Sequence, residues 1–163
     1  MPGPKVEWKS KISWRAKLHK PTPPKLVPVP EGMEKRLGDG MMLIPTALEV
    51  DAMVRKIARG QVSSASQIRR RLARWHNADV TCPMVTGIFL RIVAEAAEED
   101  RIAGKPEITP YWRVLREDGG LYAKFPGGMD AQARRLMEEG HHVVNGKVVG
   151  CALSGNMAVK RSA

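Results

Sequence analysis

The sequence predicts a mainly helical domain with a small amount of β-structure, of the α+β class. Apolar residues recur at helical spacing in four segments between residues 46 and 140. Between the last two of these lies "ITPYWRVL", a short run of β-branched and aromatic residues typical of a strand. Near the end, "VVNGKVV" has an Asn-Gly pair flanked by valines, which is typical of a two-residue hairpin. Helices therefore dominate, and strands are few and short.

Length and composition limit the class of protein. The 163 residues, 43% of them apolar, suffice for one domain with its own core. No apolar run reaches the length of a membrane span or a signal peptide, so we expect a cytoplasmic protein. We also expect a monomer. Cys82 and Cys151 lack the spacing of a zinc site, and a disulfide is not expected in a reducing compartment. We interpret both as packing residues and expect no metal and no other cofactor.

Charge is the strongest indication of a partner. The chain has 27 Lys and Arg against 17 Asp and Glu, a formal net charge of +10. Basic proteins favour polyanions, because neutralising phosphates releases condensed counterions. Nucleic acid is the favoured partner on this ground. A soluble basic protein with no such partner is the alternative.

Three regions are predicted along the chain. Residues 1–45 are basic and hold five prolines between positions 21 and 30, which excludes helix there and favours an extended arm outside the core. Within the arm, Trp8 and Trp14 are expected to pin it to the domain, and stacking on bases is the alternative. Residues 46–142 form the domain itself, and residues 143–163 form a hairpin and tail.

The first two helices of the domain have clear starts. Thr46 and Glu49 have the spacing of a capping box, and the helix that they begin ends before Gly60. It is expected to bury Val50, Met53, Val54 and Ile57. Ser63 or Ser64 caps the second helix. Its apolar stripe is predicted to hold Ile68, Leu72 and Trp75. Arg70 and Arg74 fall opposite that stripe, either as a solvated face or as phosphate contacts.

The third helix is long and divided in charge. It begins near Pro83 and ends at Gly104. Four acidic side chains in its second half would repel phosphates: Glu95, Glu98, Glu99 and Asp100. The helix is therefore expected to approach DNA through its N-terminal end, the positive pole of its dipole. Together with the second helix it has the order of a helix-turn-helix.

The residues after the third helix predict a wing. "ITPYWRVLRE" and "LYAKFPGG" are interpreted as a strand and a wing, which makes the domain a winged helix-turn-helix. A last helix over residues 128–139 is expected to bury Met129, Ala133, Leu136 and Met137.

Three segments occur in a characteristic order: "QVSSASQI", "ITPYWRVLREDGGL" and "FPGGMDAQARRLMEEGH". Over residues 47–142 this order resembles the DNA-binding, active-site domain of the alkylguanine-DNA alkyltransferases and alkyltransferase-like proteins. The resemblance implies a DNA-repair protein that binds double-stranded DNA, alkylated DNA included. It also implies a repair-protein partner and association with the nucleoid when bound to DNA.

The same resemblance implies that the chain is not an enzyme. Residues 110–114 match the family's Pro-Cys-His-Arg-Val motif, and the cysteine and histidine fall on Tyr111 and Trp112. A phenol with a pKa near 10 is a poor nucleophile, and an indole cannot act as a base. Glu139, which matches the family's triad carboxylate, has no imidazole to orient and is expected to make a helix-end hydrogen bond.

The resemblance also supplies the candidate site. Pro110, Tyr111, Trp112 and Arg113 are expected to form a pocket for an extruded base. The expected DNA contacts are Ser63, Ser64, Gln67, Arg70, Arg74, Met84, Arg91, Lys124, Gly127 and Gly128. The family's phosphate-rotating tyrosine falls on Ala65 and its arginine finger on Met84, a side chain that can act as an apolar wedge. Arg91 is the alternative for the finger position.

Two other functions stay open at this point. The first is a winged-helix module that binds DNA or another protein without base flipping, with the two aromatics in the core. The second is an enzyme that uses Cys82, because a thiolate at a helix start would be stabilised.

Overall fold

The computed structural model describes residues 12–150, and this part of the chain is a mixture of helices and small sheets. The α+β class is thereby confirmed. Trp8 and Cys151 lie outside the described residues. Among the described residues, no helix is both long and apolar enough to span a membrane.

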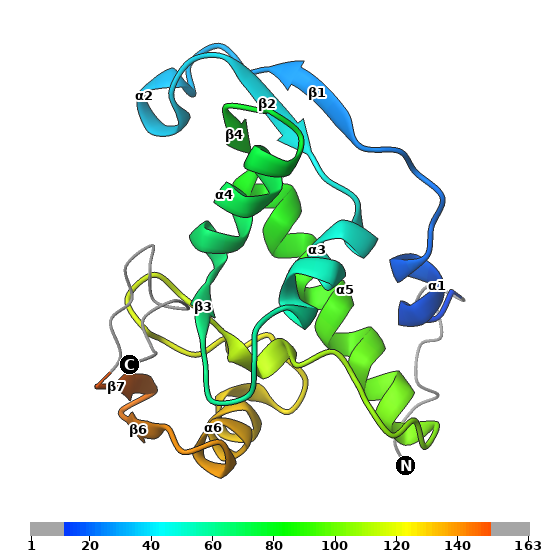
Figure 1. Cartoon of the computed structure of the whole chain (residues 1–163), viewed down its shortest axis with the longest axis vertical. Helices are drawn as coiled ribbons and strands as arrows, with labels where there is room; N and C mark the ends of the chain where they lie inside the picture. The colour runs from blue at the N-terminus through cyan, green and yellow to red at the C-terminus, as the bar shows by residue number, and fades with distance from the viewer. Residues whose placement is uncertain (1–11, 151–163) are drawn as a thin grey trace, which may run out of the picture.

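The elements follow one another along the chain as a helical core with strands at its ends. The helices are α1 (Trp14–Leu18), α2 (Glu34–Leu37), α3 (Ala47–Arg55), α4 (Ala65–Trp75), α5 (Pro83–Ile102) and α6 (Gly128–Glu138), with a 3-10 turn, η1, at Tyr111–Arg113. The strands are β1 (Lys25–Pro28), β2 (Met41–Ile44), β3 (Ser63–Ser64), β4 (Val80–Thr81), β5 (Val114–Leu115), β6 (His142–Val144) and β7 (Lys147–Val149). Helix α5 runs through the middle, with β2 and β4 toward one end of the molecule and α6 toward the other (Figure 1).

The segment before residue 46 differs from the predicted arm. Strand β2 is the central strand of a three-stranded sheet, antiparallel to β1 and parallel to β4. Leu43 on this strand is fully buried, and Leu18 of α1 belongs to the same core cluster. The prolines do keep residues 21–30 free of helix, as expected. Apolar residues on both sides of the proline segment fold back onto the domain, because the helices leave apolar surface that they cover.

The predicted helix starts are correct. Glu49 N donates to Thr46 Oγ1 (3.1 Å) and Thr46 N donates to Glu49 Oε1 (2.9 Å), so the capping box at α3 is complete. At α4 the cap is Ser64, whose Oγ accepts from Gln67 N at 3.1 Å. The stripe predicted for the first helix, Val50, Met53, Val54 and Ile57, is buried as expected.

Two helix faces differ from the prediction. Trp75 was expected in the core, but it is 56% exposed at the last position of α4. On α6, Met129 and Met137 are exposed, and Gln132 is buried instead. The Gln132 amide donates to the carbonyls of Trp112 (3.1 Å) and Val114 (2.9 Å), which need a donor where α6 covers them.

The predicted strand is much shorter than expected. Residues 111–113 form the turn η1, and only Val114 and Leu115 form a strand, which pairs parallel with β3. The hairpin β6–β7 is present, with positive φ at both Asn145 (51°) and Gly146 (75°), as its Asn-Gly turn requires. The order of α4 and α5 is that of a helix-turn-helix, and the wing stays a prediction.

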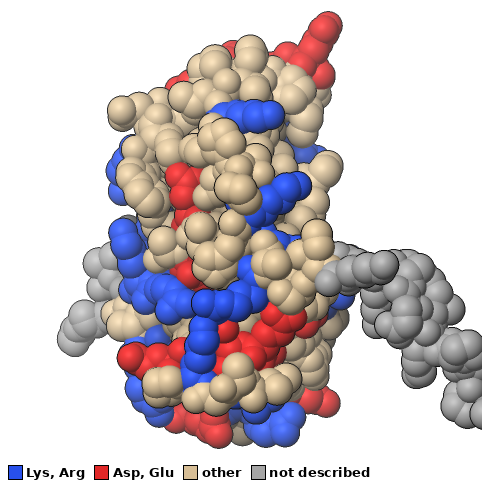
Figure 2. All heavy atoms as spheres, turned by 90° about the vertical axis from the view of Figure 1, so that its right-hand side faces the viewer, with Lys and Arg blue, Asp and Glu red and all other residues tan. Residues whose placement is uncertain are grey.

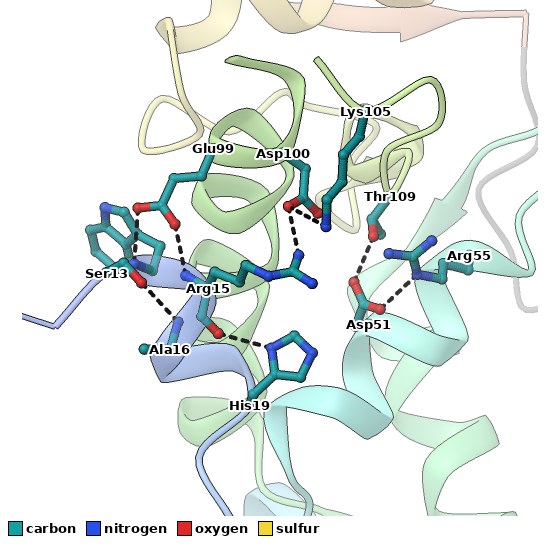
Figure 3. A network of polar contacts seen from close by, with 11 residues as sticks. Ser13, Arg15, Ala16, His19, Asp51, Arg55, Glu99, Asp100, Lys105 and Thr109 are labelled. Carbon is teal, nitrogen blue, oxygen red and sulfur yellow. Dashed lines mark hydrogen bonds and ion pairs between the residues drawn. The ribbon is translucent and has the colours of Figure 1, made fainter. Parts of the chain in front are cut away.

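A polar network fixes α1 and the segment before η1. Trp14 N and Arg15 N donate to the Glu99 carboxylate at 3.0 and 2.8 Å, and Arg15 pairs with Asp100 at 2.6 Å (Figure 3). Beside it, the buried Asp51 accepts from Thr109 Oγ1 at 2.7 Å. The acidic second half of α5 thus holds α1: Glu99 accepts from two backbone N–H groups, and Asp100 pairs with a guanidinium.

Candidate nucleic-acid interface

The aromatic pair predicted to line a base pocket lies in the core. Tyr111 is 2% exposed and Trp112 is 8% exposed, and their rings meet edge to face with centroids 5.4 Å apart. Tyr111 makes a second edge-to-face contact, with Phe125 at 5.4 Å. Such pairs add to the energy of burial. Neither ring lines the cavity beside α5 or the hollows along α4.

Both rings also bind a carboxylate. Tyr111 Oη donates to Glu98 Oε2 at 2.7 Å, and Arg135 Nη2 donates to the same oxygen at 3.0 Å. Burial, together with this hydrogen bond, raises the pKa of the Tyr111 phenol, so it stays protonated at neutral pH. Trp112 Nε1 donates to Glu139 Oε2 at 3.1 Å. The rings therefore tie η1 to α5 and to the end of α6.

Glu139 has a larger role than the helix-end acceptor that was expected. Its side chain is 3% exposed, and it accepts from Arg113 Nη2 at 2.7 Å and Nε at 2.9 Å. Arg113 Nη1 also donates to the carbonyl of Ile57 at 2.6 Å. Burial alone would raise the pKa of Glu139, but the hydrogen bonds from Arg113 and Trp112 outweigh it and lower that pKa below the ordinary value. Arg113 therefore has a structural role, and Pro110 is buried.

A cavity of about 710 Å³ lies next to this core, between α1, the first half of α5 and residues 116–125. Three of the predicted DNA contacts line it together: Met84 and Arg91 from α5, and Lys124 from the segment before α6. The lining also includes Lys17 and Arg116, which the sequence analysis did not single out. The described residues that line it include no Asp or Glu.

Aromatic rings form part of the cavity wall. Phe125 stacks on Tyr122 with centroids 4.6 Å apart, and behind Phe125 lies Tyr111. The Trp14 ring also lines the cavity, with Lys17 Nζ at 4.2 Å and the Arg91 guanidinium at 5.6 Å from its centroid. Trp14 thus pins α1 to the domain, as predicted, and also borders the cavity. In the sequence, the feature that indicated a role for Trp14 was an aromatic residue within a basic segment.

A second hollow of about 470 Å³ runs along α4. Its lining includes Arg70 and Arg74, as the helical wheel predicted, and also Arg36 of α2 and Arg69. Within the described part of the chain, none of these four side chains forms an ion pair. The acidic residue of the lining, Asp79, accepts from Met41 N at 2.8 Å. Guanidinium groups without a carboxylate partner in a groove are suited to phosphate.

Five other residues that were predicted to contact DNA have a structural role instead. Ser63, Ser64 and Gln67 are buried, and Ser63 Oγ donates to Gln67 Oε1 at 3.1 Å. Gly127 and Gly128 have φ of 77° and 75° at the start of α6, and a Cβ on Gly127 would lie 2.6 Å from the Cβ of Ala131. These glycines shape the turn into α6.

Positive and negative side chains are mixed on part of the surface. On the face that carries α1, basic and acidic side chains lie side by side (Figure 2).

Cys82, at the N-cap of α5, is a free and half-buried thiol. Between residues 12 and 150, no group of His, Cys, Asp and Glu has the arrangement of a metal site.

These features define a small α+β protein with two neighbouring basic hollows, which is the kind of surface that polyanions prefer. No protein-family model matches the chain, and no curated protein matches it. Among solved structures, the chain is similar to S. pombe Atl1 in complex with damaged DNA containing O6-carboxymethylguanine. The identity is 21% and the TM-score 0.41, over 60% of this chain and 78% of that chain. A likeness of this size supports no statement about function, which has to rest on the residues of this chain.

Proposed function

We propose that this protein binds duplex DNA without reacting with it, through the groove along α4 and the cavity beside α5. The observation that carries the proposal is the charge of the two hollows, whose described lining holds eight Lys or Arg and one acidic residue. Thr81 lines the groove and Pro83 lines the cavity, so the hollows adjoin at the start of α5. A phosphate backbone laid across that point meets cations on both sides and the positive end of a helix.

In this proposal α4 and α5 act as a winged helix-turn-helix pair, with the N-terminal half of α5 toward the DNA. Glu99 and Asp100 in the second half of α5 are paired with α1. Glu98 is bound by Tyr111 and Arg135. The fourth of these carboxylates, Glu95, pairs with Arg91 of the cavity lining at 3.7 Å. All four carboxylates therefore have partners within the fold, and none of them lines the cavity itself.

We place the recognition of an extruded, alkylated base in the cavity rather than at Tyr111 and Trp112. Its volume lies in the range of small-molecule sites, and Phe125, Tyr122 and Trp14 give it aromatic walls. Met84 at its edge is exposed and can fill the gap left in the base stack. Stacking on aromatic rings is worth about 1–3 kcal/mol per base. Unstacking costs a few kcal/mol, so an undamaged base stays in the duplex.

One observation favours DNA binding without base extrusion. Tyr111 and Trp112 are core residues, as binding without base extrusion requires. Their rings are therefore not exposed to a base at the position where the resemblance placed the pocket. The two versions differ in whether an alkyl group on guanine strengthens binding.

The duplex contact is tested with the double variant Arg36→Ala, Arg70→Ala. Both side chains are exposed and line only the α4 groove, so the fold should be unaffected. For a fluorescent duplex, we expect weaker binding and a slope of log K against log salt reduced by about 2, roughly one for each lost phosphate contact. The measurement is fluorescence anisotropy over a salt series.

Arg134→Ala is the matched control, since Arg134 is an exposed arginine on α6 that lines neither hollow. It should lower affinity less than either Arg36→Ala or Arg70→Ala alone. If the double variant keeps the wild-type affinity and slope, the α4 groove is not the duplex contact.

Base recognition is tested with the same duplex carrying O6-alkylguanine or guanine at one position. We expect tighter binding of the alkylated duplex, a preference reduced by Met84→Ala, and an unchanged intact-protein mass. Equal affinity of the wild-type protein for both duplexes would establish binding without base extrusion. A mass gain at Cys82 would show group transfer and end the non-covalent proposal.

A further inference from the structure

A second aromatic and basic site lies at the end of α4. Trp75 is exposed and borders a shallow hollow of about 430 Å³. Lys56, Arg71 and Arg74 also line it, and its described lining includes no acidic residue. The Lys56 ammonium lies 5.9 Å from the centroid of the Trp75 ring. This hollow contains neither the cavity residues nor the aromatic pair of η1.

The chemistry of the hollow selects its ligand. A single exposed apolar residue needs no explanation, but an indole set among three cations is a poor surface for an apolar protein segment. It suits a ligand that has both a flat ring and a negative charge, because the ring stacks on indole and the charge meets Lys and Arg. A nucleotide unit has both parts.

We propose that Trp75 is a stacking platform for an unpaired base of single-stranded DNA, with the adjoining phosphates held by Lys56, Arg71 and Arg74. Inside a duplex both faces of a base are covered by its neighbours, so an open indole face selects unpaired bases. Arg74 lines both this hollow and the α4 groove, so the two basic surfaces are continuous there. The inference goes beyond the proposed duplex contact and does not require it.

The test compares a labelled single-stranded 15-mer with the blunt duplex of the same sequence, using the full-length chain. Trp75→Ala should weaken single-strand binding about 5- to 150-fold, the equivalent of losing one stacked base. Trp75→Phe should restore most of it, because a phenyl ring still stacks. Binding of the blunt duplex should change less than about twofold. Quenching of tryptophan emission by the single strand should be smaller in Trp75→Phe than in the wild-type protein.

Met137→Ala is the matched control, since Met137 is 57% exposed on α6 and lies outside the hollow. It should bind both probes like the wild-type protein. The proposal is overturned if Trp75→Ala binds the single strand as tightly as the wild type, or loses single strand and duplex equally. Loss of single-strand binding in Trp75→Ala, with unchanged duplex binding in Arg36→Ala, Arg70→Ala, would keep this inference and end the proposed duplex contact.

Discussion

Replacing Trp112 with alanine is expected to destabilise the protein by about 3–5 kcal/mol, the usual cost of removing a buried large aromatic. The ring is buried, packs edge to face on Tyr111 and donates to Glu139. Arg135 also lies over it, at 4.4 Å from its centroid. The substitution therefore opens a cavity and leaves a buried carboxylate with one donor fewer. Urea unfolding measures the loss.

Trp75→Ala is the control for this prediction, because it removes the same side chain from an exposed position. It should change the free energy of unfolding by less than about 0.5 kcal/mol. At a temperature where both proteins are folded, Trp112→Ala should keep the wild-type ratio of affinities for alkylated and plain duplex. If Trp112→Ala changes the ratio of affinities for alkylated and plain duplex without changing stability, Trp112 would be part of the base pocket.

The second large effect is expected at the buried pair of Arg113 and Glu139. Glu139→Ala leaves the guanidinium without its carboxylate, and breaking such a pair costs about 3–5 kcal/mol. The neighbouring Glu138 is exposed, so Glu138→Ala is the matched control and should be nearly neutral. Comparable losses in the two variants would mean that the pair adds nothing beyond helix-end effects.

The same pair gives the protein a pH dependence with a definite sign. The pKa of Glu139 in the folded protein lies below its ordinary value of 4.5, so its stabilising contribution is present above pH 4.5 and is lost as the pH falls through the lowered pKa. The pKa of Glu98 is also lowered: burial would raise it, but hydrogen bonds from Arg101 and Tyr111 outweigh this. Between about pH 5 and pH 3, Glu139→Gln should lose less stability than the wild type. If urea unfolding shows that the wild type and Glu139→Gln lose the same stability over this pH range, Glu139 is not a source of the pH dependence.

Tyr111 and Trp112 have a structural role at the two positions where the resemblance expects reactive groups. Tyr111 binds Glu98 of α5, and Trp112 binds Glu139 at the end of α6. Recognition, in the proposal, moves to the other side of Phe125, where the cavity lies. The candidate surface for DNA then depends on cations and apolar walls, and on no nucleophile.

The sequence by itself determined the local features. The capping box at Thr46, the Asn-Gly hairpin and the arginine face of α4 all follow from residue type and spacing within one element. Spacing also placed Met84 at the start of a helix whose N-terminal end leads toward the proposed ligand. Such features depend on backbone geometry that repeats within a few residues, so the chain alone specifies them.

Only the tertiary structure decided which surfaces are covered. Helical spacing predicted a buried Trp75, but at the end of α4 this residue is left 56% exposed. A pocket was predicted at Tyr111, but α5 and α6 close over it, and the cavity forms instead where α1 returns to α5 and brings Lys17 beside Arg91 and Lys124. Burial depends on contacts between segments far apart in the chain, and a periodic pattern within one helix says nothing about what will cover its faces.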